Sequence, residues 1–337
     1  MSLKELARKL NLSPTSLSLV LNGSPAANSI PKATKDLIFA AAKRFNYRPN
    51  FLARSLRVQR TYAVGVLMPE LSEGYSSLVL AGIEEFLAGA GYLYLATSHR
   101  HEEKQIVKNT SLLLERGVEG LIAVDTPLSL IPGWRPMVSV SGHERIPDTT
   151  SVVLNHDAAA ALALGHLAEL GHREIAIIKG QSFSADSEVR FQAILGAATR
   201  LGLSIEERRV AQLEGNSPSP ATGYDAARKL LERGTGFTAL FAFNDISAMG
   251  AMRAFQDAGL RAPQDVSIVG FDDVLGAAYH TPSLTTIRQP LRKMGMIAAE
   301  ALLQRLAPAG DGPPEFIQVE PELIVRESTG PARKRPA

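Results

Sequence analysis

From Tyr62 onward, short apolar runs alternate with stretches of helical periodicity. Continuous apolar runs separated by helices are typical of parallel strands buried on both faces of a sheet. The number of runs is high for a single sheet, so we predict an α/β fold with two doubly wound parallel-sheet lobes. The predicted strands are residues 63–68, 92–97, 120–124, 137–141, 151–155, 174–178, 209–213, 239–243, 266–271 and 285–289.

The chain is divided by charge. Its 36 Lys/Arg and 34 Asp/Glu give a net charge of +2. The first sixty residues hold basic residues in large excess, with only Glu5 and Asp36 as acids, and the remainder is acidic. A small basic module on a large acidic one predicts a polyanion as the partner of the first module.

The basic module has the pattern of a helix-turn-helix. Apolar residues at helical spacing predict a helix over 3–10. Ser13 is a good N-cap and Pro14 suits the first position of a second helix that ends near Asn22. A third amphipathic helix is expected from about residue 31.

The second helix has an unusual outward face. At about 100° per residue, Thr15, Leu19 and Asn22 fall together, opposite the apolar side. In a helix-turn-helix this helix enters the major groove, where an apolar side chain contacts a thymine methyl. Leu19 is therefore predicted to read DNA, although an isolated surface leucine is also common. The hydroxyls of Ser13, Ser16 and Ser18 and the Asn22 amide are expected to contact phosphates.

Residues 48–60, RPNFLARSLRVQR, are too apolar for a plain linker. A short helix here would be marginal alone and would fold when something packs against it. From spacing alone, two interpretations are equally open. In the first, Leu56 is an apolar wedge that inserts into the minor groove of DNA. In the second, Leu52 and Leu56 pack against the following domain.

Several motifs occur in the order of one known family: SLSLVLN, PNFLARSL, LGHREIAII, the stretch from FAFNDISAMG to SIVGFDDV, and TPSLTTIRQP. Over about residues 2–330 the chain resembles the lactose/galactose repressor family of bacterial transcription factors. The resemblance implies a helix-turn-helix headpiece at 1–49, a hinge helix and linker at 50–61, and a periplasmic-binding-protein-like effector-binding core at 62–330. Its first lobe is expected at about 62–156 and 289–317, its second at about 157–288 and 318–330, and a disordered basic tail at 331–337.

The resemblance also implies a homodimeric regulator, a repressor, that binds double-stranded operator DNA and inserts a hinge leucine into the minor groove. Leu56 occupies that position. The family's base-reading positions fall on Pro14, Thr15 and Leu19. Its backbone contacts fall on Ser13, Ser18, Asn22 and Arg54. Pro14 and Leu19 replace the polar readers frequent in the family, and the loop 23–30 is longer than usual, so the operator sequence is expected to differ.

Polar residues cluster where predicted strands end, which is where open parallel sheets bind ligands. Carboxylate, guanidinium and amide groups near an aromatic ring suit a sugar. The resemblance points to the same positions. The predicted effector-binding residues are Tyr75, Ser141, Ser184, Asp186, Arg190, Asn244 and Asp272.

Each of these residues has a structural alternative. Asp186 and Arg190 have the spacing of a simple ion pair, Asn244 could cap the next helix, and Tyr75 could lie in a dimer interface. His143 is a weaker pocket candidate, and a neutral loop histidine is the interpretation we favour.

The family has a purine-binding branch that uses an aromatic pair and an arginine. In this chain Ser76 follows Tyr75, Ser184 stands in place of the arginine, and Pro218 in place of a stacking ring. These departures favour a sugar or a sugar phosphate over a purine. A sugar phosphate would need further cationic groups near Arg190, and none is obvious.

Other classes of protein find no support. There is no cysteine, no G-x-S-x-G elbow and no P-loop, so we expect no enzyme and no cofactor. His99 and His101 are expected in a solvated loop rather than at a metal, and no metal site is predicted. The charged N-terminus and the lack of a long apolar run predict a cytoplasmic protein without a membrane partner. A solute-binding module for transport would have no use for residues 1–60.

Overall fold

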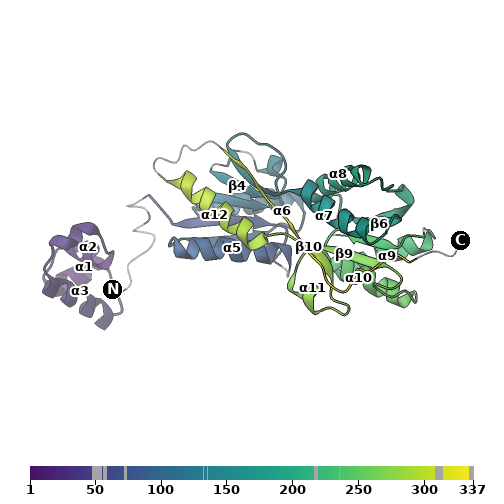
Figure 1. Ribbon diagram of the computed structural model, residues 1–337. Coiled ribbons are helices and arrows are strands. Elements are labelled where there is room, and N and C mark those ends of the chain that lie inside the picture. Colours follow the sequence, from purple (N-terminus) through teal and green to yellow (C-terminus); the bar gives the residue numbers. More distant parts are fainter. Residues whose placement is uncertain are drawn as a thin grey trace. The chain divides into compact units, whose positions relative to one another are not determined.

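The computed structural model describes most of the chain as two compact units, Met1–Thr61 and Tyr62–Ala337 (Figure 1). The described residues are 1–47, 55, 59–71, 74–131, 133–134, 136–215, 219–234, 236–307 and 314–333. Arg54, Leu56, Pro218 and most of the predicted hinge 50–61 lie outside them, so the expectations placed there stay predictions.

The first unit is a three-helix module. Helices α1 (Leu3–Leu10), α2 (Pro14–Leu21) and α3 (Lys32–Arg44) enclose a small apolar core, and a short 3-10 helix, η1 (Pro25–Ser29), precedes α3. The predicted start of α2 is confirmed: Ser13 is its N-cap and accepts a hydrogen bond from the Ser16 backbone N–H at 3.0 Å.

The first lobe of the second unit is a six-stranded parallel sheet in the order β11-β5-β4-β3-β1-β2. Helices α5 and α12 pack side by side on one face (Figure 1). The elements of this lobe are β1 (Ala63–Met68), α5 (Tyr75–Gly89), β2 (Leu93–Ser98), α6 (Glu103–Glu115), β3 (Gly120–Val124), η2 (Leu128–Leu130), β4 (Met137–Val140), β5 (Thr149–Leu154), α12 (Leu291–Leu306) and β11 (Phe316–Val319).

The second lobe repeats this plan in the order β12-β10-β9-β8-β6-β7, parallel except for the edge strand β12. Its elements are α7 (His156–Glu169), β6 (Ile175–Lys179), α8 (Ala185–Arg200), η3 (Glu207–Arg209), β7 (Val210–Gln212), α9 (Pro220–Glu232), β8 (Ala239–Ala242), α10 (Asp245–Asp257), β9 (Ser267–Asp272), α11 (Leu275–Tyr279), β10 (Thr285–Arg288) and β12 (Glu322–Ile324).

Both sheets have the doubly wound order in which the chain reverses direction beside the first strand, and this order opens a crevice at the carboxyl ends of the strands. All the strands predicted from the apolar runs are present, which confirms the α/β fold with two lobes. The chain passes between the lobes after β5, after β10 and after β11.

The C-terminal end differs from expectation over residues 331–333, which were expected in a disordered tail. The Ala332 backbone N–H donates to the Leu170 carbonyl at 2.8 Å, and Arg333 pairs with Asp265 at 2.5 Å. These contacts hold the segment against the second lobe. In the described part of the chain, no helix has both the length and the apolar character needed to cross a membrane.

Helix packing in the first lobe depends on two glycines. A Cβ added at Gly82 of α5 would lie 1.9 Å from the Arg292 carbonyl oxygen of α12, and one at Gly295 of α12 would lie 2.1 Å from the Val79 oxygen. Real atoms do not approach so closely, so any side chain here forces the two helices apart.

We therefore expect Gly295→Ala to lower the free energy of unfolding by about 2 kcal/mol or more. The matched control is Gly165→Ala in the interior of α7, where an added Cβ meets no atom within 4 Å. This control should gain about 0.5–1 kcal/mol from helix propensity. Denaturant unfolding measures both, and a Gly295→Ala variant as stable as the wild type would contradict the close helix packing.

Candidate functional site

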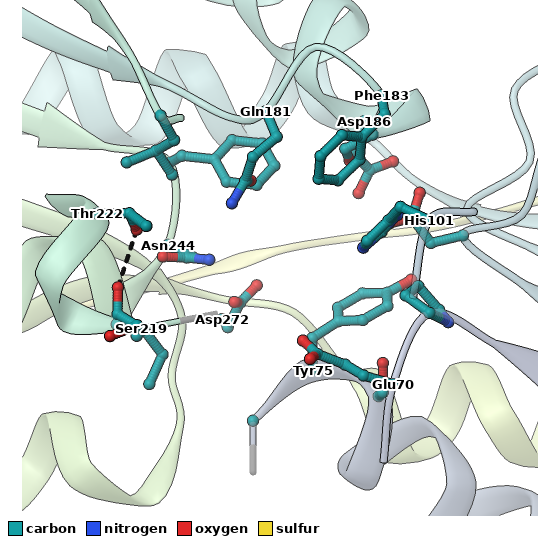
Figure 2. A pocket seen from close by; sticks show the side chains of 18 of the residues that line it. Glu70, Tyr75, His101, Gln181, Phe183, Asp186, Ser219, Thr222, Asn244 and Asp272 are labelled. Carbon is teal, nitrogen blue, oxygen red and sulfur yellow. Dashed lines mark hydrogen bonds between the residues drawn. The ribbon is translucent and has the colours of Figure 1, made fainter. Parts of the chain in front are cut away.

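A pocket lies between the two lobes, at the carboxyl ends of their strands (Figure 2). The first lobe contributes Glu70, Tyr75, His101 and Asp125, which follow β1, β2 and β3. Facing them from the second lobe are the loop after β6, the start of α8, and the residues that follow β8 and end β9. Several of these side chains point into the same space (Figure 2).

The pocket brings together nearly all of the residues predicted to bind the effector. Ser141 does not line it, but its hydroxyl lies 2.6 Å from the Tyr75 hydroxyl and so positions that ring. Those that line it are Tyr75, Ser184, Asp186, Arg190, Asn244 and Asp272.

Arg190 is held on several sides. It is 4% exposed, and its Nη2 donates to Asp186 Oδ2 at 3.2 Å, which confirms the predicted i, i+4 ion pair. Its Nη1 donates a second hydrogen bond, to the Phe243 carbonyl oxygen. The guanidinium carbon lies 3.6 Å from the Phe271 ring centroid and 4.3 Å from that of Phe243, so the group is clamped by cation–π contacts as well. These contacts fix the orientation of the guanidinium in the pocket wall.

Asp272 is buried at the end of β9 in a strained conformation. Its φ of 107° lies in a region that favours glycine, and strain of this kind concentrates at functional sites. Gln289 Nε2 donates to Oδ1 at 2.6 Å. Burial is the main reason that the pKa of Asp272 rises from its usual 3.8 to about 7, although Arg190 and Gln289 both oppose the rise.

A second carboxylate beneath the site keeps this loop in place. Asp245 accepts hydrogen bonds from the Val274 backbone N–H at 2.8 Å and from the Thr286 hydroxyl at 2.6 Å. Asn244 beside it is the N-cap of α10 and accepts from the Ser247 N–H at 2.8 Å. The predicted capping role of Asn244 is therefore confirmed, and the residue lines the pocket as well.

Asp125 also lines the pocket, although it was not predicted from the sequence. It follows β3 directly, at φ 40°, and its Oδ1 is buried with no hydrogen-bond partner among the described residues. Burial and the nearby Asp186 charge raise the pKa of Asp125 to about 7. The rule that found Asp272, a polar residue after a buried strand, applies equally here.

His99 and His101 do not lie in a solvated loop, and that prediction was wrong. His99 is fully buried and its Nε2 lies 3.0 Å from the Thr126 hydroxyl. The ring of His101 lies against Phe183 of the other lobe, with centroids 4.0 Å apart, and forms part of the pocket wall (Figure 2). Burial lowers the pKa of each histidine to about 4, so both rings are neutral at physiological pH.

His143 is also more than a loop residue. Its Nε2 lies 2.5 Å from Asp186 Oδ1, and its side chain is 15% exposed. Burial opposes ionisation of Asp186, but His156, His143 and Arg190 around it prevail and hold its pKa well below 3.8.

In the first unit, the predicted DNA-contacting residues divide into two groups. Ser13, Pro14 and Thr15 at the start of α2 are exposed and Ser16 is half-buried, as base and phosphate contacts require. Leu19 is half-buried, with part of its side chain against the core and part open.

Ser18 does not fit the predicted phosphate contact in this conformation. Its side chain is 8% exposed, and Asn22 Nδ2 donates to both its hydroxyl and its carbonyl, at 3.2 and 2.7 Å. The two residues are bonded to each other because they lie one helical turn apart.

Comparison with known proteins gives one consistent result. A family model described as a periplasmic binding protein-like domain matches residues 164–329. The chain is 34% identical over 343 residues to the HTH-type transcriptional repressor PurR of Yersinia pestis bv. Antiqua (strain Antiqua), with 98% of each chain covered.

Solved structures agree. The lac repressor dimer bound to operator and the anti-inducer ONPF is similar with a TM-score of 0.85 at 25% identity, covering 98% of this chain and 99% of that one. A complex of the transcriptional regulator CelR with cellobiose gives a TM-score of 0.73 at 26% identity, covering 97% and 99%.

A helix-turn-helix module joined to a two-lobed core with a polar pocket defines a ligand-responsive, DNA-binding transcription regulator rather than an enzyme. More specifically, the chain belongs to the LacI family, the lactose/galactose repressor family predicted from its motifs.

Proposed function

We propose that the effector of this regulator is a neutral sugar, bound between the lobes. The observation that carries the proposal is the charge of the pocket wall. Asp125, Asp186 and Asp272 line it, and among the lining residues that the structure describes Arg190 is the one permanent cation. An anionic ligand would lie beside Asp186, whose pKa is held well below 3.8, and beside Asp125 and Asp272, whose pKa values burial raises to about 7. Any negative charge on these groups would repel it. A sugar phosphate is therefore disfavoured.

The remaining groups suit sugar hydroxyls. Asp272 and Asn244 offer acceptors and Asn244 also a donor, while Tyr75, His101 and Phe183 offer apolar faces for the CH side of a ring. The similar CelR structure contains cellobiose, which is consistent with this assignment.

A purine is the second candidate, favoured by the 34% identity to a repressor named PurR. Against it, Ser76 is 6% exposed and offers no second ring beside Tyr75, and Ser184 offers no guanidinium. The stacking of His101 on Phe183 is the feature of the wall that a flat base would use.

In the cytoplasm, a homodimer would present two α2 helices to the half-sites of a palindromic operator. Effector and operator then act on the same arrangement of lobes, so each changes the affinity for the other by the same factor. The proposal includes base contacts by Thr15 and Leu19 and minor-groove insertion by Leu56.

Thermal unfolding of the purified protein against sugars, sugar phosphates and purines tests the effector class. A ligand that binds only the native state raises the unfolding midpoint with its concentration. We expect a neutral sugar to do so. A midpoint raised by purines alone would establish the second candidate, and a response to sugar phosphates would contradict the charge argument.

For the DNA-binding face, we expect Leu19→Ala to weaken operator binding about tenfold at fixed salt because a thymine-methyl contact is lost. Binding to unrelated DNA should hardly change, since phosphate contacts supply it. Leu37→Ala, a leucine 50% exposed on α3, is the control and should keep wild-type affinity. Equal weakening for operator and unrelated DNA in a fluorescence anisotropy titration would remove Leu19 as a base reader.

A further inference from the structure

Three groups able to ligate a metal meet beside the pocket: His143, His156 and Asp186. One ligand atom from each lies within 4.8 Å of the others. Nε2 of His143 is 2.5 Å from Asp186 Oδ1, and Nε2 of His156 is 3.4 Å from the same oxygen. His143 lies in the loop after β4, His156 is the first residue of α7, and Asp186 lies in the first turn of α8. Because they are far apart in the chain, no short sequence motif predicts this cluster.

His156 is the unusual member of the cluster. It is 4% exposed, and its Nδ1 has no hydrogen-bond partner among the described residues. Its Nε2 lies 3.4 Å from Asp186 Oδ1 without meeting the geometry of a hydrogen bond. Buried polar atoms without partners are rare and costly, and an absent ion is one of the few reasons for them.

We infer that His143, His156 and Asp186 bind a divalent transition-metal ion of the Zn²⁺ class, a site that the sequence did not predict. Two imidazoles and one carboxylate are a ligand set that Zn²⁺ accepts, with a fourth position for water. Bonds of about 2.0–2.1 Å place tetrahedral ligand atoms about 3.3 Å apart. His156 and Asp186 already have this spacing, at 3.4 Å. His143, the more exposed ligand, has to retreat by less than about 1 Å.

The surroundings support a cation. The second oxygen of Asp186 accepts from Arg190 Nη2, which orients the carboxylate as the outer partners of metal ligands do. Asp125 and Asp272, nearby, are two further buried carboxyl groups that an added positive charge would stabilise in their ionised form.

The ion would join the lobes, because His143 belongs to the first lobe and Asp186 to the second. Metal binding should therefore favour the lobe arrangement described above, and the native state over the unfolded one. This inference does not depend on which effector the pocket takes.

The test uses untagged, full-length protein treated with a chelator. Zn²⁺ is titrated by calorimetry, and Co²⁺ is titrated by the visible absorption that reports its coordination. We expect one saturable site and a thermal midpoint that rises with Zn²⁺. His143→Gln and His156→Gln should each weaken Zn²⁺ binding at least tenfold, while keeping a cooperative unfolding transition without metal.

Two histidine variants are the controls. His280→Gln, a histidine near Pro282 in the second lobe, should bind Zn²⁺ like the wild type. His101→Gln tests whether Zn²⁺ binds instead at His99 and His101, the other pair of neighbouring histidines, whose ring centroids lie 5.6 Å apart. Loss of binding in His101→Gln but not in His143→Gln would overturn the site, as would wild-type protein that takes up no Zn²⁺. If His143→Gln and His156→Gln fail to fold, the Co²⁺ spectrum of the wild type still tests the proposed site. A spectrum of six-coordinate Co²⁺ with oxygen ligands alone would contradict ligation by two histidines.

Discussion

Asp272→Asn should make the protein more stable above pH 7 while weakening its response to effector. The carboxyl group is 7% exposed and has a pKa of about 7, against 3.8 ordinarily. An amide removes the cost of burying a charge, and asparagine tolerates the positive φ of this position better than most residues. Its Oδ1 still accepts from Gln289.

The pH dependence has a definite sign. Between about pH 4 and pH 7 the folded protein keeps a proton on Asp272 that the unfolded chain releases, so this group lowers stability as the pH rises. The shift from 3.8 to about 7 corresponds to at most about 4 kcal/mol, at 1.4 kcal/mol for each pH unit. We expect Asp272→Asn to match the wild type near pH 4 and to exceed it by about 2–4 kcal/mol near pH 8.

Effector affinity should fall roughly 10- to 100-fold in the same variant, because a hydrogen bond to a charged acceptor is lost. The matched control is Asp273→Asn. Asp273 is the next residue and pairs with Arg288 at 2.7 Å and Arg326 at 2.6 Å. This control should lose stability and keep effector affinity. Urea unfolding at several pH values and titration with the effector measure both quantities. A stability difference that does not grow with pH would contradict the assigned pKa.

The core fold could be predicted from sequence because its parallel strands are continuous apolar runs. β1 and β9 are buried along almost their whole length, and their positions follow from composition alone. β11 and β12 were missed. Both are short edge strands with half-exposed or exposed residues, such as Phe316 at 40%, and their pairing depends on partners far away in the chain.

The pocket was predictable to the extent that one rule applies, polar residues after buried strands. That rule led to Asp272, Asn244 and Ser141, and applied consistently it would also have found Asp125. It could not find the contact between His101 and Phe183, which exists only because two lobes close on each other. Spacing also gave no sign that His143 and His156 would meet Asp186.

Arg190→Ala should have two separable effects, on folding and on the effector. Asp186, 5% exposed, would lose its guanidinium, and the Phe243 carbonyl would lose a donor. Breaking a buried ion pair from one side costs about 3–5 kcal/mol, and His143, 2.5 Å from the same carboxylate, should keep the loss near the lower end of that range. The free energy of unfolding should fall by that amount. Loss of the effector response in this variant alone would therefore not distinguish reduced stability from a lost contact with the effector.

Arg190→Lys separates the effect on stability from the effect on effector binding. Lysine keeps the positive charge beside Asp186 but has neither the planar face that lies 3.6 Å from the Phe271 centroid nor the second donor in a fixed fork. Stability should fall less than in the alanine variant, while effector affinity falls at least tenfold. Operator binding measured well below the unfolding midpoint should be retained in both variants, because the residues proposed to contact DNA lie in a separate unit.

Arg209→Ala is the control for a buried arginine outside the pocket. Arg209 is also 4% exposed, and it pairs with Glu174 and, at 3.2 Å, with Glu206. Its loss should lower the free energy of unfolding while effector affinity stays at the wild-type value. If Arg190→Lys responds to effector at wild-type concentrations, Arg190 serves only to hold Asp186 and the lobe around it. If instead Arg209→Ala also loses the response, reduced stability alone explains both results, and the pocket assignment of Arg190 fails.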